Sequence, residues 1–407
     1  MSPISRTTRA ALAASVVALT MVVATACGPD NSDPAGAQTA TPTAAATTPG
    51  KPGAAPIKLP TAEELKTWKF EDWDKWAQQN VITPAVKGFW DLKKILEAKP
   101  SKPKPPAQPT GQPTAQPSSA APAQPTTQPP AQPATQPPAG DNGNDPLPKV
   151  VDAKAVPHPY AKNFHVNGKI FSQHEDGNYY ECSGTVVSDP AHPGKSNLVW
   201  TASHCVHGGK GAGYYKNLMF APAFNSNGVL SGGKQATLAQ AEPYGEWSMT
   251  DAIASPQWPA EADHKTGGPW SQYDFAIVRV ENPNGGDKSL EETVGGSVPV
   301  WFNAPRDQLT SVSDYGYPAD APFDGMELEH CDGGKPVRLS MDVKRPPMLT
   351  IGCNMTPGDS GGGWFATKDG KQVLVSDVSI GDGTWEAGPY LDDVAAKAMD
   401  YFSKKKK

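Results

Sequence analysis

The sequence predicts an all-β domain that ends in a single helix and follows a long segment unable to form a core. After residue 150, short apolar runs alternate with clusters of Gly, Pro, Asn and Asp, a pattern typical of strands joined by turns. Only 392–402 combines helix-forming residues with an apolar stripe. Because 44 of the 407 residues are Pro, 39 are Gly and 37% are hydrophobic, we expect much of the chain to stay unfolded.

The charge balance argues against a nucleic-acid partner. The formal net charge is −6. Affinity for phosphate depends on clustered Lys and Arg, which a mildly acidic chain lacks. We therefore expect no nucleic acid among the partners.

Residues 1–26 are predicted to be a signal peptide. Arg6 and Arg9 precede an apolar run that stops at Cys27, and this run is shorter than the ~20 residues needed to span a membrane. Residues 24–26 (ATA) fit a signal-peptidase site, and together with Cys27 they also resemble a lipobox that has Ala24 in place of the usual Leu. Either Cys27 is lipidated and anchors the chain to the outer face of the membrane, or the chain is secreted. Lipidation removes the odd thiol among five cysteines.

Two short amphipathic helices are expected in 61–98, behind a polar, disordered tether over 27–60. Thr61 and Glu64 have the spacing of a capping box, and Pro84 should break the helical run. About forty residues rarely fold alone. The segment therefore either packs on the main domain, serves as an inhibitory pro-segment, or docks the protein to the cell surface.

Residues 99–148 are predicted to form a disordered, Pro-rich linker. Repeated Ala-Gln-Pro and Thr-Gln-Pro units block helix and sheet and favour extended polyproline II. At ~3.1 Å per residue, about fifty such residues reach on the order of 150 Å. Such a spacer could hold a domain away from a membrane or carry it through a cell wall.

The remaining residues, 149–403, are expected to form one β domain followed by a basic tail, 404–407. Strands are predicted around the apolar runs 184–187, 198–200, 275–278 and 373–375. The C-terminal helix should bury a stripe formed by Val394, Met399 and Phe402.

A histidine follows one of these predicted strands and lies directly beside a cysteine. The stretch 198–205 (LVWTASHC) places His204 next to Cys205, with Cys182 upstream. In an oxidising compartment, a Cys182–Cys205 disulfide would hold the histidine-bearing turn against the neighbouring strand.

A serine lies in a glycine-rich turn at 358–362 (GDSGG). Glycines allow a turn tight enough to point two amide groups at one place, where Ser360 is presented. The spacing also matches the nucleophile elbow of α/β-hydrolases, but those enzymes place the histidine after the serine, and 361–407 contains none.

Asp274 lies at the start of an apolar run, within 273–280 (YDFAIVRV). Desolvation by apolar neighbours leaves Asp274 in need of a partner, and an imidazolium supplies one. Turn capping is the simpler interpretation of Asp274 alone, but the order His204, Asp274, Ser360 favours a catalytic set.

These three motifs resemble those of the trypsin-like serine peptidases, which have the chymotrypsin fold. The resemblance begins near Tyr160 and continues to the end of the chain. It is closest to bacterial V8-like secreted peptidases, through 168–171 (GKIF), 220–224 (FAPAF) and 244–247 (YGEW). The implied fold is two six-stranded antiparallel β-barrels with a C-terminal helix.

The resemblance also implies the role of each site residue. Ser360 would be the nucleophile, His204 the general base and Asp274 its orienting acid, and the N–H groups of Gly358 and Ser360 would form the oxyanion hole. The substrate-binding residues would be Asn354, Ser379 and Gly381, with the Ser379 hydroxyl supporting Asp274. A second disulfide would join Cys331 to Cys353.

Departures from the family pattern limit what the resemblance says about specificity. Asn354 stands where trypsin's pocket has an acid, which argues against strict Lys or Arg cleavage, although Asp382 could supply charge. No histidine follows Ser360, which argues against Glu specificity.

Activation also departs from the family pattern. The family's amino-terminal partner for Asp359 would require a cut near Lys149 or Lys154, and no usual activation sequence is present. The enzyme either works while tethered, or loses the tether as a propeptide.

The sequence thus predicts an exported serine endopeptidase that acts on peptide or protein substrates, as a monomer. We expect no cofactor and no metal, because the chain has no His-Glu-x-x-His motif and its eight histidines are scattered. The alternative is an inactive peptidase-fold protein that serves as a cell-surface binding or adhesion module.

Overall fold

The computed structural model describes residues 64, 67–77, 82–101, 103 and 141–406. The predicted signal peptide, Cys27 and the tether lie outside the described residues, as does 104–140 of the predicted linker. None of the helices in the described ranges is long and apolar enough to cross a membrane.

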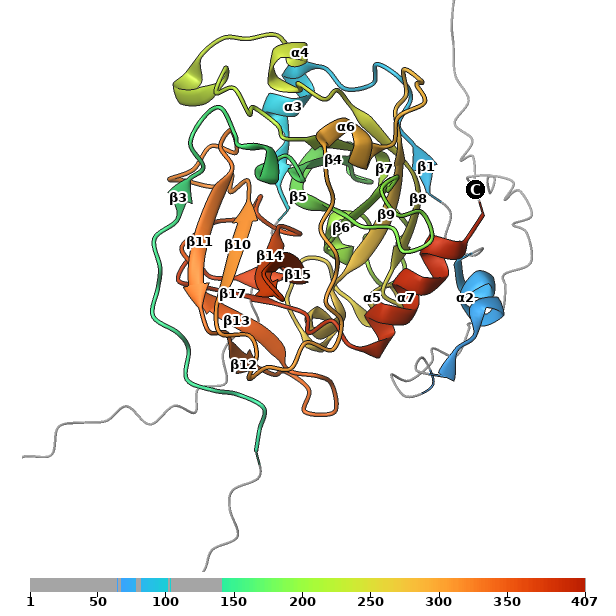
Figure 1. Cartoon of the computed structure of the whole chain (residues 1–407), viewed down its shortest axis with the longest axis vertical. Helices are drawn as coiled ribbons and strands as arrows, with labels where there is room; N and C mark the ends of the chain where they lie inside the picture. Colours follow the sequence, from blue (N-terminus) through green and yellow to red (C-terminus); the bar gives the residue numbers. More distant parts are fainter. Residues whose placement is uncertain (1–63, 65–66, 78–81, 102, 104–140, 407) are drawn as a thin grey trace, which may run out of the picture. The chain divides into compact units, whose positions relative to one another are not determined.

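Six antiparallel strands form a closed barrel in the first half of the domain (Figure 1). Their order is β7-β4-β5-β6-β9-β8, and pairing of β7 with β8 closes the ring. The strands are β4 (Asn167–Gln173), β5 (Tyr179–Val187), β6 (Leu198–Thr201), β7 (Lys216–Pro222), β8 (Trp247–Ala254) and β9 (Ala276–Glu281). The apolar side chains of β6 and β9, including Trp200 and Ile277, are fully buried in the barrel core.

Two further sheets form the second half of the domain. One has the strand order β15-β14-β10-β11-β3 and the other has the order β12-β13-β17-β16. The second half therefore consists of a five-stranded and a four-stranded sheet, where the sequence predicts a second six-stranded barrel. The strands are β3 (Lys154–Ala155), β10 (Val312–Gly316), β11 (Glu329–Gly334), β12 (Val337–Leu339), β13 (Met348–Gly352), β14 (Gly363–Lys368), β15 (Lys371–Asp377), β16 (Ile380–Gly381) and β17 (Trp385–Gly388). The all-β class and the four predicted strand runs are confirmed.

Helices within residues 141–406 are few and short, apart from the predicted C-terminal one. They are α4 (Leu238–Ala241), α5 (Gln257–Glu261), α6 (Leu290–Val294) and α7 (Asp393–Lys404), with 3-10 turns at η1 (Lys162–Phe164), η2 (Ser203–Cys205), η3 (Ser231–Gly233) and η4 (Pro269–Tyr273). The Asp392 side chain caps α7 by accepting from the Val394 N–H. Val394, Met399 and Phe402 are buried, which confirms the predicted apolar stripe.

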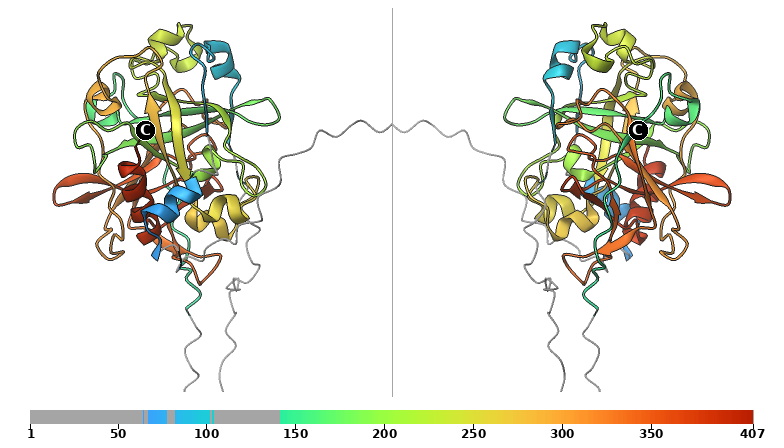
Figure 2. Two further views of the ribbon diagram at one scale, coloured as in Figure 1. Left: turned by 90° about the vertical axis from the view of Figure 1, so that its right-hand side faces the viewer. Right: turned by 90° about the vertical axis from the view of Figure 1, so that its left-hand side faces the viewer.

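The helical segment before the linker packs on this domain. It contains α2 (Phe70–Ala77), β1 (Thr83–Pro84) and α3 (Leu92–Glu97). Figures 1 and 2 show α2 beside α7, where Trp73 is buried and Tyr401 donates a 3.0 Å hydrogen bond to Asp74. These buried contacts favour packing on the main domain over a free docking element.

The first residues of the predicted linker are ordered instead of free. Lys99–Pro100 form β2, which pairs in parallel with Tyr180 and Glu181 of β5. Ser101 and Pro103, which follow β2 in the chain, are also buried. Composition alone could not reveal this pairing, because the partner strand lies far away in the sequence.

Candidate active site

The pairing of β6 with β9 brings His204 and Asp274 together. Thr201 at the end of β6 lies opposite Ala276 at the start of β9. The turn after β6 carries His204, and Asp274 lies two residues before the first residue of β9. Both side chains are buried, and His204 Nδ1 lies 2.7 Å from Asp274 Oδ2.

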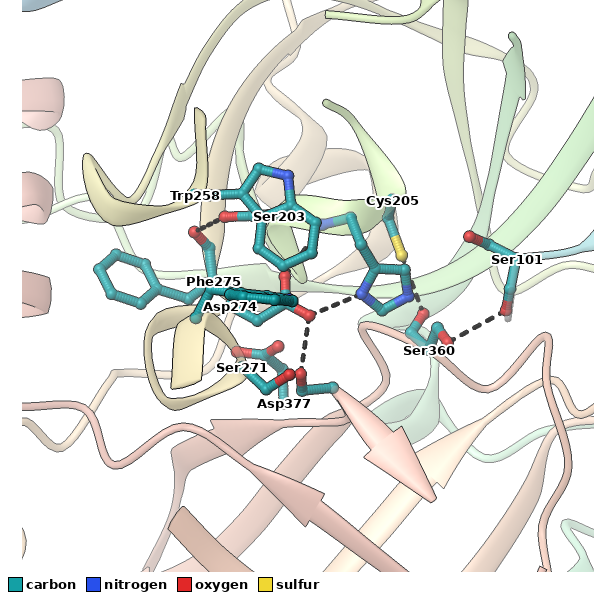
Figure 3. Close-up of polar contacts among 12 residues, drawn as sticks. Ser101, Ser203, Cys205, Trp258, Ser271, Asp274, Phe275, Ser360 and Asp377 are labelled. Carbon is teal, nitrogen blue, oxygen red and sulfur yellow. Dashed lines mark hydrogen bonds and ion pairs between the residues drawn. The ribbon is translucent and has the colours of Figure 1, made fainter. Parts of the chain in front are cut away.

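Asp274 accepts hydrogen bonds from three directions in the centre of the site (Figure 3). Its Oδ1 accepts from the His204 backbone N–H at 2.9 Å, and its Oδ2 accepts from the Ser379 hydroxyl at 2.7 Å as well as facing the imidazole. These donors stabilise an ionised carboxylate in a buried place. An ionised Asp274 keeps the imidazole proton on Nδ1, which leaves the Nε2 lone pair available as a base.

The turn that carries Ser360 packs directly against the turn that carries the histidine. Cys205 Sγ lies 3.4 Å from the Ser360 carbonyl oxygen. Gly361 has φ +80°, and a Cβ there would lie 2.1 Å from Thr201 Oγ1, so only glycine fits at this contact. The glycine-rich sequence therefore places Ser360 beside the histidine turn.

Two disulfides are present at the positions that the sequence predicts. Cys182–Cys205 joins β5 to the histidine turn, and Cys331–Cys353 joins β11 to the segment before the serine turn. The predicted pairing is confirmed.

The nucleophile candidate is covered. Only 5% of Ser360 is exposed, and its hydroxyl donates a 3.3 Å hydrogen bond to the carbonyl oxygen of Ser101 (Figure 3). His204 Nε2 has no hydrogen-bond partner among the described residues. The base and the serine hydroxyl are therefore not bonded to each other in this structure.

A cavity of about 280 Å³ opens beside Ser360. Ser379 and Gly381 line it, as expected of substrate-binding residues. Asn354 does not: its side chain accepts from the Ala153 N–H and donates to Asp152. The structure thus brings two of the three predicted substrate-binding residues to the cavity and ties the third to the segment after the linker.

Three buried carboxyl groups lie together next to this cavity: Asp314, Asp359 and Glu386. Burial and the neighbouring carboxyl groups raise the pKa of each well above its usual range. Asp359 therefore faces other acids here, and its pairing with a freed amino terminus stays a prediction. Sequence reasoning missed Asp314 and Glu386, since only the tertiary structure brings their side chains together with Asp359.

Among the described residues, two groups bring possible metal ligands together, and each of them includes cysteine. One contains Asp314, Glu386 and Cys353, and the other contains His204 with Cys182 and Cys205. All three cysteines are in disulfides, which removes the thiolate that a metal requires.

A further buried carboxyl group, that of Asp377, lies near Asp274 and was also missed by sequence reasoning. Asp377 accepts a 2.8 Å hydrogen bond from the Trp200 indole N–H. Burial and the nearby Asp274 raise the pKa of Asp377 well above its usual range. A neutral Asp377 would add no charge that competes with Asp274 for the imidazole.

Comparison with known proteins gave matches among solved structures only. No family model and no curated protein matches the chain. Protease Anisep from Arthrobacter nicotinovorans is 31% identical, with 62% of this chain and 98% of that chain covered and a TM-score of 0.47. The thermostable serine protease AL20 from an extremophilic microorganism is 28% identical, with 60% and 100% covered and a TM-score of 0.48.

A Glu endopeptidase is also similar, at 17% identity over 64% of this chain and 99% of that chain, with a TM-score of 0.44. This match is too distant to place the chain among the V8-like enzymes. That narrower placement stays a prediction.

Proposed function

Because the chain belongs to the trypsin-like serine peptidases, we propose that it is an exported endopeptidase that hydrolyses peptide bonds through an acyl-enzyme on Ser360. The observation that carries the proposal is the buried pair His204–Asp274, 2.7 Å apart, on a turn in contact with the serine turn. The complete set of three residues supports an enzyme over the binding-only alternative.

The proposed reaction begins with attack of Ser360 Oγ on the substrate carbonyl carbon. His204 Nε2 accepts the hydroxyl proton and later donates it to the leaving amine, while Asp274 holds the Nδ1 proton and stabilises the imidazolium. Water then attacks the acyl-enzyme by the same proton path in reverse, which releases the acid product and restores Ser360.

The backbone N–H groups of Gly358 and Ser360 are the proposed oxyanion hole. Donors of this kind stabilise the transition state by about 3 kcal/mol each in related enzymes. The tetrahedral oxygen carries the charge that they stabilise. Ser379 and Gly381, which line the cavity, are the proposed contacts for the substrate backbone.

Two disulfides indicate an extracellular protein. We propose export through the signal peptide 1–26, with retention at the membrane if Cys27 is lipidated. The catalytic domain is proposed to be 149–403, with 27–60 and 104–140 as spacers; 141–148 bonds to the domain instead, through Asp145 and Arg338. Intact-mass measurement of the protein from its cell surface tests acylation of Cys27.

A fluorophosphonate probe tests the nucleophile. We expect a single adduct on Ser360, which Ser360→Ala abolishes with the fold intact by circular dichroism. Ser313→Ala, a change on β10, is the matched control and should leave labelling unchanged. Labelling should be measured on the full chain and on a Ser101→Pro chain, because Ser101 engages the nucleophile. A folded protein that forms no adduct in either chain would contradict the proposed function.

A further inference from the structure

We propose that the strap, the described residues 82–101 and 103, is a built-in inhibitor that holds Ser360 in an unreactive hydrogen bond. The proposal rests on the proposed function of that site. It assigns an inhibitory role to the residues expected to begin the linker and identifies the contact responsible. Figure 3 shows Ser101 facing Ser360, which accounts for the burial of the nucleophile.

The contact with the strap is non-productive. For attack, Ser360 Oγ must face a carbonyl carbon whose oxygen accepts from the oxyanion-hole N–H groups. Here the oxygen of Ser101 accepts the hydrogen bond from Ser360 Oγ itself, at 3.3 Å. The serine proton is thereby directed away from His204 Nε2, which has no partner among the described residues. The strap thus occupies the site without presenting a bond to be cut.

Backbone pairing fixes the strap at this position. Lys99 and Pro100 lie opposite Tyr180 and Glu181, and the Ser101 N–H donates a 3.0 Å hydrogen bond to the Glu181 carbonyl oxygen. Glu181 directly precedes Cys182, whose disulfide to Cys205 holds the histidine turn. The position of the strap is therefore fixed relative to β5 and to the disulfide that holds the histidine turn.

A buried aromatic anchor holds the strap upstream of this contact. Trp90 is 3% exposed, and its indole N–H donates a 2.8 Å hydrogen bond to the Asn217 carbonyl oxygen. Its ring lies 5.5 Å from the ring of Phe171 and 5.4 Å from that of Tyr179. Ile95 of α3 is buried in the same cluster. Burial of these apolar side chains contributes to the affinity between the strap and the domain.

The strap also forms part of the cavity wall. Pro103 lines the cavity together with Ser360, Ser379 and Gly381. A substrate that fills the cavity therefore meets Pro103. Release of the strap would both free the hydroxyl and remove Pro103 from the substrate path.

Two variants at one position test the inhibitory contact. Ser101→Pro removes the N–H that pairs with Glu181, whereas Ser101→Ala keeps both backbone groups and is the matched control. Losing one hydrogen bond should raise the rate of fluorophosphonate labelling about fivefold or more in the proline variant. The alanine variant should label as slowly as the full chain. Equal rates in all three chains, with labelling at Ser360, would overturn the strap proposal but leave the peptidase proposal intact.

A second arm tests the anchor and works in trans. Trp90→Ala should label faster than the unchanged chain, and a synthetic peptide of residues 82–103 should restore slow labelling. The same peptide with Ser101→Pro should restore it less. If the peptide has no effect and the anchor variant labels at the unchanged rate, the strap is not an inhibitor. A folded chain that never labels, with or without the strap variants, would overturn the peptidase proposal and the inhibitory role together.

Discussion

The Ser379 hydroxyl donates a 2.7 Å hydrogen bond to Asp274 Oδ2, the same oxygen that lies 2.7 Å from His204 Nδ1. One carboxylate oxygen therefore joins residues of the two halves of the domain. The orientation of the imidazole depends on this junction, because Asp274 lies beside β9 of the barrel and Ser379 lies beside β16 of the other half.

Replacing Asp274 by Asn should lower kcat about 10⁴-fold, as in enzymes with this arrangement, because the amide stabilises the wrong imidazole tautomer. Steady-state hydrolysis of a peptide substrate measures the loss. Asp263→Asn, a change in an exposed loop, is the control and should retain full activity. A loss of less than tenfold in Asp274→Asn would contradict the role of Asp274.

Removing the Ser379 hydroxyl should lower kcat/KM about fivefold, since one hydrogen bond contributes about 1 kcal/mol. Ser376→Ala is the matched control: it is a buried serine whose hydroxyl donates to the Pro389 carbonyl oxygen at 2.8 Å, away from Asp274. Both variants should lose similar stability in denaturant unfolding. Equal activity in the two variants would show that Ser379 does not position Asp274.

The two disulfides should contribute similarly to stability but differently to activity. Their sequence separations are 23 and 22 residues, and loops of this size stabilise by about 3 kcal/mol each. Replacing Cys182 and Cys205 by Ala should also lower kcat, because that bridge holds the histidine turn. Denaturant unfolding and peptide hydrolysis, measured on both double variants, separate the effects. A greater activity loss from the Cys331–Cys353 variant would reverse this assignment.

Glu242 should make the domain less stable as pH rises. It is 5% exposed, and burial, with a smaller effect from Glu246, raises its pKa from the ordinary value of 4.5 to about 8. The folded state thus binds a proton that the unfolded state has released, so stability falls between about pH 4.5 and pH 8.

Glu242→Gln should remove this loss and stabilise the protein at pH 8.5 by on the order of 2–4 kcal/mol, with little effect at pH 4. Urea unfolding at both pH values measures the difference. Glu291→Gln is a control acid on α6. A Glu242→Gln effect of the same size at both pH values would show that Glu242 does not titrate on unfolding.

Local sequence patterns were sufficient to predict several strands and the C-terminal helix of the domain. The apolar runs around Val186, Trp200, Ile277 and Leu374 became strands, and the stripe around Val394 became the buried face of α7. These features depend on neighbouring residues and on periodicity, which a single sequence displays. The order of the three catalytic candidates was readable for the same reason, since each lies in a short motif.

Other features depended on pairings between distant segments. Lys99–Pro100 have the composition of a linker, yet they pair with Tyr180 and Glu181 because the edge of β5 offers free backbone groups. Glu386 lines the cavity only because β16 and β17 pair in one register, with Gly381 opposite it. Asn354 had the expected sequence position but turned toward Asp152.

The sequence by itself determined four strand runs and the C-terminal helix of the domain, and it singled out His204, Asp274 and Ser360 as the catalytic candidates, because short motifs and periodic burial specify them. Only the tertiary structure decided that Ser101 engages Ser360 and that Glu386 lies in the cavity. Those contacts join residues that are far apart in the chain, and local composition carries no information about which distant backbone or carboxylate a residue will meet.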